Sequence, residues 1–176
     1  MPSPEEAITA YILAKDGNRP HLLSRAFDPE AEVRLEVRTA AIAFPDRIRG
    51  LAAIEDALVR RFAAEFENVY TFCLARPAAD ARQFSCSWLV GMVAKADGML
   101  RVGVGTYDWA FAGDGRVARL TITIETMPSL PPAPAVLDWL AALPYPWCAK
   151  KVAQATLPAL PALDPIARSP HLAAKF

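Results

Sequence analysis

The sequence predicts an α+β fold in which helices cover one face of a mainly antiparallel sheet. Helical periodicity occurs at the N-terminus and again after Gly50, and strand-like patterns follow each helical region. Just over half of the 176 residues are apolar, which indicates a large buried interior. A chain of this length suits one hydrophobic core with a modest appendage.

The N-terminal segment predicts a helical hairpin. Ser3-Pro4-Glu5-Glu6 supplies an N-cap, a proline at the first helical position and a capping-box glutamate. Apolar residues follow at helical spacing, so the first helix should run to about Gly17. A second, short helix should begin at Pro20 and end before Asp28-Pro29.

A strand pair and a long helix are expected next. Residues Glu32 to Arg38 alternate strictly between charged and apolar, which predicts a half-buried strand, and a second apolar run ends near Phe44-Pro45. An amphipathic helix should follow Gly50. Its apolar stripe consists of Ile54, Ala57, Leu58, Phe62 and Phe66.

The region from Asn68 to Met127 predicts a four-stranded antiparallel meander, because it is rich in Val, Ile, Thr and aromatic residues. Asp97-Gly98 and Asp114-Gly115 match the preference of tight hairpin turns.

After Pro128 the composition shifts to Pro, Ala and Leu. We therefore divide the chain into a domain, residues 1–128, and a C-terminal extension, residues 129–176. Short helices are expected in the extension around Ala135 to Leu143 and Trp147 to Leu157.

Charge and motif content exclude several function classes. Lys plus Arg equal Asp plus Glu at 19 each, so no net field favours nucleic acid as a partner. The three cysteines lack any metal-binding spacing, and we expect buried free thiols, no metal and no cofactor. The N-terminus lacks a signal-peptide pattern and no apolar run could span a bilayer, so no membrane partner and a cytoplasmic location are expected.

Three phrases of the sequence carry a family resemblance. The first consists of Tyr11-Ile-Leu-Ala-Lys-Asp followed by Phe27-Asp-Pro-Glu-Ala. The second is Ile48-Arg-Gly-Leu-Ala-Ala-Ile, and the third starts with Gly105-Thr-Tyr-Asp-Trp-Ala-Phe. Their order resembles the nuclear transport factor 2-like superfamily, which includes SnoaL-like polyketide cyclases and ketosteroid isomerases. The resemblance covers about the first three-quarters of the chain. It implies a cystatin-like cone, in which a curved mixed or antiparallel sheet wraps around the N-terminal helices and the long helix and leaves an apolar pocket.

The resemblance also implies site residues. Tyr11 corresponds to an oxyanion-binding tyrosine, and Asp108 to a protonated acid beside it that donates a second hydrogen bond. The position of the general base is occupied by Leu35, which cannot accept a proton. Steroid-type isomerisation is therefore not expected.

Strand alternation places Asp108 on one face with Val102 and Thr106, and the resemblance implies that this face is the inward one. A two-residue turn at Asp97-Gly98 would place Ser87 directly opposite Asp108. Both residues have a structural alternative, Tyr11 as a buried core tyrosine and Asp108 as a hydrogen-bonded acid. Ligand contacts are expected from Ser87, Leu35, Thr106, Leu120, Ile122 and Phe62.

Two functional hypotheses follow. In the first, the chain binds a small apolar, carbonyl-containing molecule and acts as an isomerase, cyclase or dehydratase with Tyr11 and Asp108 as oxyanion donors. In the second, it is a non-catalytic ligand-binding or dimeric assembly module.

The same alternation predicts an apolar platform on the sheet face opposite the pocket. Left exposed, this face would exceed the few hundred Å² that a monomer tolerates. We expect a homodimer through the sheet, with the extension at its edge or reaching the partner subunit. The platform consists of Phe84, Cys86, Trp88, Val90, Met92, Tyr107, Trp109 and Phe111, and the extension could cover it with Leu137, Trp139, Leu140, Leu143 and Trp147.

Overall fold

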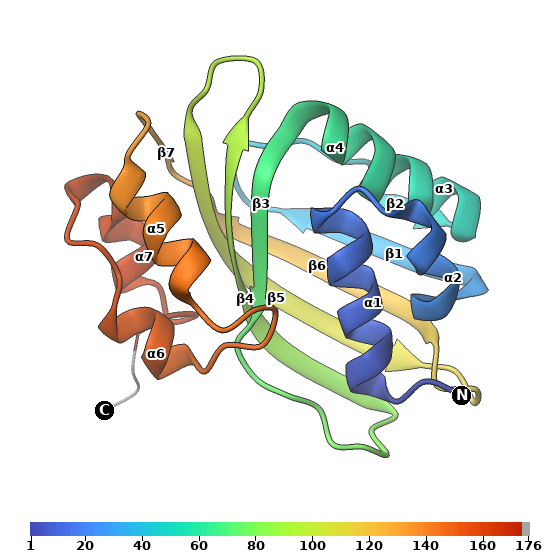
Figure 1. The fold of residues 1–176 in the computed structure, drawn as a ribbon. Helices are drawn as coiled ribbons and strands as arrows, with labels where there is room; N and C mark the ends of the chain where they lie inside the picture. The colour runs from blue at the N-terminus through green and yellow to red at the C-terminus, as the bar shows by residue number, and fades with distance from the viewer. Residues whose placement is uncertain (174–176) are drawn as a thin grey trace.

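The computed structural model describes residues 1–173 and confirms the α+β architecture (Figure 1). One curved sheet separates two layers of helices. The strands are β1 (Phe27–Val37), β2 (Arg47–Arg49), β3 (Phe66–Cys73), β4 (Gln83–Ala94), β5 (Leu100–Phe111), β6 (Val117–Thr126) and β7 (Ser129–Leu130). The α-helices are α1 (Pro4–Asp16), α2 (Leu23–Ala26), α3 (Leu51–Glu55), α4 (Arg61–Glu65), α5 (Pro134–Ala142), α6 (Lys150–Ala155) and α7 (Asp164–Arg168).

The N-terminal helical hairpin forms as predicted. The Ser3 hydroxyl accepts a hydrogen bond from the Glu6 amide at 3.2 Å, and the Glu6 carboxylate accepts one from the Ser3 amide at 2.8 Å, which completes the capping box. A single 3₁₀ turn, Pro20–Leu22, precedes α2. The buried residues of α1 pack against the sheet, and this contact fixes the orientation of the helix.

The sheet has the strand order β2-β1-β6-β5-β4-β3, with β7 added beside β5. Strands β3 to β6 form the predicted antiparallel meander, whereas β1 runs parallel to β6. β1 begins at Phe27, earlier than the charge alternation indicated, because Phe27 already pairs with Val117; a register shift follows between Phe27 and Glu32. The apolar run that ends at Phe44-Pro45 is a loop, and β1 pairs instead with the short β2.

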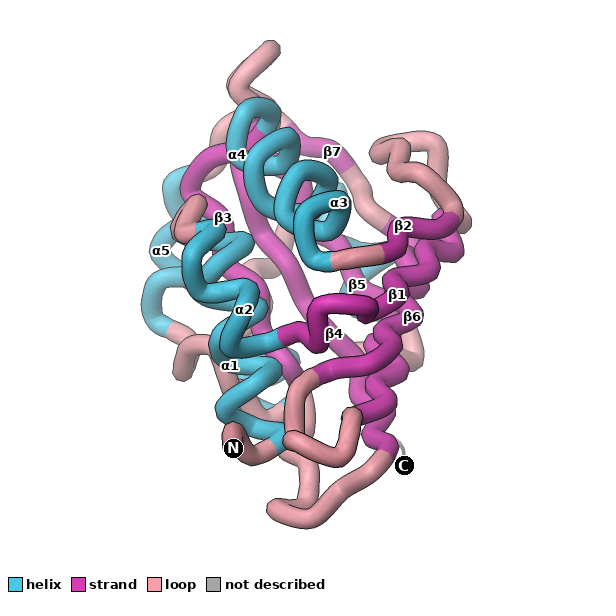
Figure 2. The backbone as a smooth tube through the Cα atoms, turned by 90° about the vertical axis from the view of Figure 1, so that its right-hand side faces the viewer, coloured by secondary structure: helices cyan, strands magenta, loops and turns pink. Residues whose placement is uncertain are grey.

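The long helix after Gly50 is one continuous helical segment with a π-helical turn, Asp56–Arg60, between α3 and α4. Ile54, Leu58 and Phe62 are buried along it, as its apolar stripe predicted. Phe66 belongs to β3 instead of the helix. Helices α1 to α4 therefore lie over the concave face of the sheet, which we call the inner face (Figure 2).

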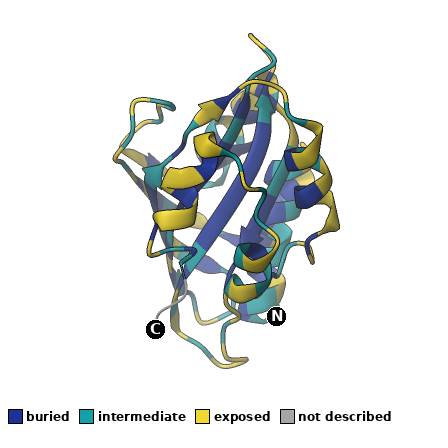
Figure 3. Ribbon diagram, turned by 90° about the vertical axis from the view of Figure 1, so that its left-hand side faces the viewer, coloured by how far each residue is buried: buried dark blue, intermediate teal, exposed yellow. Residues whose placement is uncertain are grey.

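The extension packs on the opposite, outer face of the sheet (Figure 3). Helices α5 and α6 agree with the two predicted short helices, whereas β7 and α7 were not predicted. These elements enclose a second hydrophobic core with the outer-facing residues of β3, β4 and β5. The sheet residues in this second core are Phe72, Leu89, Leu100, Val102 and Val104.

The assignment of the two sheet faces from sequence was wrong. Tyr107, Trp109 and Phe111 face inward and belong to the main core with α1, together with Trp88 of β4. The predicted apolar platform is therefore the lining of the cone and is not an exposed surface. Val102 and Val104 of β5 face outward and are also apolar, but the extension covers them. Strand β5 is therefore buried on both faces over part of its length.

The hairpin between β4 and β5 differs from the expected two-residue turn. Lys95 to Gly98 form a four-residue connection, closed by the bond from the Ala94 amide to the Met99 carbonyl at 2.9 Å. Ser87 therefore pairs with Thr106, and Ser85 pairs with Asp108. The three cysteines are free and buried, as expected.

Candidate functional site

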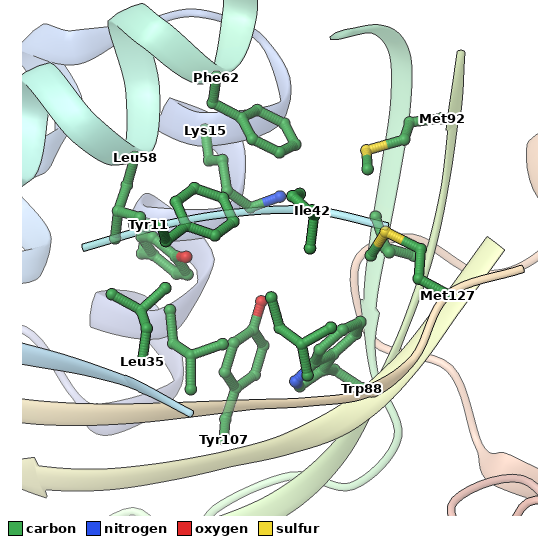
Figure 4. Close-up of a pocket in the computed structure, with 14 residues that line it drawn as sticks. Tyr11, Lys15, Leu35, Ile42, Leu58, Phe62, Trp88, Met92, Tyr107 and Met127 are labelled. Carbon is green, nitrogen blue, oxygen red and sulfur yellow. The ribbon is translucent and has the colours of Figure 1, made fainter. Parts of the chain in front are cut away.

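A cavity of about 50 Å³ lies between α1, the helix spanning residues 51–65, and the inner face of the sheet (Figure 4). Apolar side chains form most of its wall, including two methionines. Ile42 and Phe44 reach the cavity from the loop that connects β1 and β2. The complete lining is Tyr11, Lys15, Leu35, Ile42, Phe44, Leu58, Phe62, Trp88, Val90, Met92, Tyr107, Ile122, Ile124 and Met127.

Two tyrosines bring hydroxyl groups into this apolar space. Tyr11 of α1 is 1% exposed and its ring meets the Tyr107 ring edge to face at 6.1 Å between centroids. Figure 4 shows both hydroxyls directed into the region between helix and sheet. Burial raises the pKa of Tyr11 well above its ordinary value, although the nearby Tyr107 hydroxyl lowers it in part. Burial likewise raises the pKa of Tyr107, so both remain protonated hydrogen-bond donors.

A buried cation is the third polar feature of the cavity. The Lys15 ammonium donates hydrogen bonds to the Asp16 carboxylate at 2.8 Å and to the Thr71 hydroxyl at 2.7 Å, and lies 4.6 Å from the Phe62 ring centroid. Sequence reasoning missed Lys15. The signal was present, because Lys15 follows Tyr11 by four positions and shares the buried face of α1.

The Trp88 indole N–H is the fourth polar group. Trp88 is 3% exposed, and its Nε1 atom has no hydrogen-bond partner within residues 1–173. An unpaired buried donor is uncommon and costs free energy, so it marks a place where a ligand oxygen or a water could bind. Trp88 packs across Gly105 of β5, where an added Cβ would lie 2.6 Å from the indole ring.

No protein-family model and no curated protein matches the sequence. A Burkholderia thailandensis NTF2-like protein superposes with a TM-score of 0.57 at 14% identity, covering 70% of this chain and 92% of its own. The chain has the nuclear transport factor 2-like fold.

Two further structural neighbours were solved with bound molecules. A Catenulispora acidiphila protein with a ketosteroid isomerase-like fold, in complex with trimethylamine, has a TM-score of 0.54 at 18% identity, covering 66% of this chain and 83% of its own. A Mycobacterium tuberculosis protein in complex with estradiol-17β-hemisuccinate has a TM-score of 0.55 at 10% identity, and the match covers 69% of this chain and 93% of that protein. Identities this low establish the common NTF2-like fold alone.

Within this NTF2-like cone, the predicted site residues separate into two groups. Leu35, Phe62 and Ile122 line the cavity beside Tyr11, as expected. Leu120 is buried in the same core but does not line the cavity.

Asp108, Ser87 and Thr106 lie on the outer face, so three predictions about them were wrong. Asp108 is exposed, and its carboxylate accepts a hydrogen bond from the Ser85 hydroxyl. It cannot act with Tyr11, because the sheet separates them. The physical reason is strand alternation: Tyr107, one residue earlier, takes the inward position.

Ser87 instead contacts the C-terminal segment. Its hydroxyl lies 3.0 Å from Nδ1 of His171, and partial burial lowers the pKa of His171. The Ser87 and His171 pair therefore holds residues near the end of the described chain against the sheet. Residues 1–173 contain no cluster of three His, Cys, Asp or Glu side chains placed to hold a metal ion. None of the helices within this range has the length and apolar character needed to cross a membrane.

Proposed function

We propose that the chain binds a small, mainly apolar molecule in the cavity and holds a carbonyl-type oxygen of that molecule with the hydroxyls of Tyr11 and Tyr107. The observation that carries this proposal is a pair of buried, protonated hydroxyls in an apolar wall. A carbonyl oxygen accepts two hydrogen bonds, so one such atom can satisfy both donors. Tyr107 thus replaces Asp108 as the partner of Tyr11.

The dimensions of the cavity favour a ligand of few atoms. Its volume of about 50 Å³ is well below the roughly 300–1,000 Å³ typical of sites for drug-sized ligands. A larger molecule requires the walls to move. Met92 and Met127 are the most adaptable parts of the wall, because an unbranched thioether side chain repacks easily.

Binding without chemistry is favoured over isomerisation, cyclisation or dehydration. Proton abstraction requires a general base within hydrogen-bond reach of the substrate. The part of the cavity wall formed by residues 1–173 contains no carboxylate and no histidine, and Leu35 occupies the position expected for the base. The tyrosine hydroxyls could stabilise an oxyanion, but they supply no base at neutral pH because burial raises their pKa.

A homodimer through the sheet is the second candidate and stays a prediction. The predicted apolar platform lines the cone, so it is not available as the interface. A sheet-to-sheet dimer would have to use the part of the outer face that the extension leaves uncovered. Ser85, Asp108 and Arg119 are exposed there, so such an interface would be polar.

Tyr107→Phe tests the proposed function. Methyl isopropyl ketone is titrated into the ¹⁵N-labelled chain, and the Trp88 indole resonance reports occupancy of the cavity. We expect Tyr107→Phe to weaken binding by about two- to tenfold, since one hydrogen bond contributes about 0.5–1.5 kcal/mol. Asp108→Asn is the matched control on the outer face and should leave binding unchanged. Equal effects of the two substitutions, or no response of Trp88 to the ketone, would show that this cavity is not the site.

A further inference from the structure

The polar groups of the cavity share one property that the proposed function does not require. Tyr11, Tyr107 and Trp88 each present a hydrogen-bond donor, and Lys15 presents a cationic donor. Within residues 1–173, the cavity lining offers no carboxylate or amide side chain as an acceptor for a ligand donor. The complementary ligand group is therefore rich in acceptor oxygens.

The geometry around Lys15 shows how much of its ammonium remains for a ligand. Three N–H groups are available on an ammonium, and two are bonded to Asp16 and Thr71. In Figure 4 the Lys15 nitrogen points into the space between Phe62 and Ile42, which belong to the cavity wall. Because no Asp or Glu is among the described residues that line the cavity, the third N–H has no carboxylate partner there.

Asp16 balances Lys15 from the side away from the cavity. Its carboxylate also accepts hydrogen bonds from the Thr71 amide at 2.7 Å, the Thr71 hydroxyl at 2.8 Å and the Tyr145 hydroxyl at 2.8 Å. Asp16 lines a separate surface hollow beside Tyr145 and is not part of the cavity lining. Because these donors share the negative charge of Asp16, the cavity side of the ammonium keeps its attraction for an anion.

We infer that the ligand is a small monocarboxylate with a branched or short apolar body, and that Lys15 is the residue that selects the anion. This inference rests on the proposed function and names the class of molecule for the same site. The carboxylate provides about four acceptor positions, enough for Lys15 and for donors among Tyr11, Tyr107 and Trp88. A charge-assisted bond to an ammonium is also roughly twice as strong as a neutral one. The apolar body contacts Ile42, Met92 and Met127.

The test compares two molecules of the same shape. Isobutyrate and methyl isopropyl ketone differ by an oxygen in place of a methyl group, and both are titrated at about pH 7, where the carboxylate is ionised. Binding is followed through the Trp88 indole and backbone resonances of the full chain. The wild-type chain is expected to bind isobutyrate at least tenfold more tightly than the ketone.

A double variant tests the role of Lys15. Lys15→Met with Asp16→Asn removes both charges together, so no unpaired charge is left buried. This variant should bind the two molecules with affinities within about twofold of one another. Lys95→Met is the control, because Lys95 is an exposed lysine that is bonded to the Ala63 carbonyl and does not line the cavity. It should retain the full preference.

The outcomes separate this inference from the proposed function. A wild-type chain that binds the ketone as tightly as isobutyrate would overturn the carboxylate inference and leave the carbonyl site intact. A preference for isobutyrate that survives in the double variant would overturn the role of Lys15. Binding of neither molecule at the Trp88 resonance would overturn both proposals.

Discussion

The ion pair of Lys15 with Asp16 determines the electrostatics of the cavity. The two side chains are 8% and 4% exposed, so both charges have lost most of their hydration. Their mutual attraction, together with hydrogen bonds from Thr71 and Tyr145, compensates for that loss. A buried pair of this kind contributes little net stability as a whole, but loss of one partner leaves an uncompensated charge.

Lys15→Met should therefore lower the free energy of unfolding by about 3–5 kcal/mol, because the Asp16 carboxylate loses its counter-ion. The double variant Lys15→Met with Asp16→Asn should be closer to the wild type, since neither side chain is then charged. Urea denaturation of the two variants measures the difference. A double variant less stable than Lys15→Met would contradict a buried, charge-compensated pair.

Among the secondary-structure elements, strand β5 contributes side chains to both hydrophobic cores, one on each face of the sheet. Tyr107 and Trp109 point to the cavity side, whereas Val102 and Val104 point to the extension. Helix α5 approaches β4 closely at Gly91, where an added Cβ would lie 2.2 Å from a Leu140 methyl carbon. A larger residue there would force Leu140 to shift, and Leu140 is itself fully buried.

Gly91→Ala should push α5 away from the sheet. We expect a loss of about 1–3 kcal/mol of stability, which is typical of overpacking. Gly113→Ala is the matched control, because its added Cβ would meet no atom within 4 Å, and its effect should be within about 0.5 kcal/mol. Thermal unfolding of both variants measures this. Equal melting temperatures would mean that α5 does not pack on β4 as described.

The sequence predicted most elements but not the inward face of the meander. Local signals were sufficient for α1, whose capping box is complete, and for β1, whose charges alternate with Val33 and Leu35. Both faces of β5 carry apolar residues, because the extension covers part of its outer face. Alternation alone therefore cannot distinguish the inner face from the outer face. Asp108 was assigned inward for this reason. The helix spacing of Lys15 from Tyr11 indicated that it shares the buried face of α1, but its hydrogen bond to Thr71 could not be predicted, because Thr71 is distant in sequence.

In the molecule as a whole, the extension covers part of the outer face of the sheet. It also protects the edge strand β3, where the Cys73 amide bonds to the Pro146 carbonyl at 2.8 Å and the Cys148 amide to the Cys73 carbonyl at 3.1 Å. Tyr145 then links the extension to Asp16. Within residues 1–173 the exposed large apolar side chains are Met1 and Tyr145, so the covered sheet leaves no apolar patch.

We therefore propose that residues 1–128 depend on the extension, residues 129–176, for stability and solubility. A chain truncated after Met127 should unfold at lower denaturant concentration and form larger assemblies in light scattering. Its outer face would expose Phe72, Leu89, Val102 and Val104, and each such side chain contributes roughly 1.5–3 kcal/mol when buried. A chain ending at Ala173 is the control. A truncated chain with the mass and stability of this control would show that the extension is dispensable.

The most direct test of the central claim is a crystal structure of the full chain with methyl isopropyl ketone or isobutyrate bound. We predict the ligand inside the cone, with an oxygen within about 3.2 Å of the hydroxyls of Tyr11 and Tyr107. A ligand bound on the outer face beside Asp108, or one inside the cone with its oxygen directed away from both tyrosines, would contradict it.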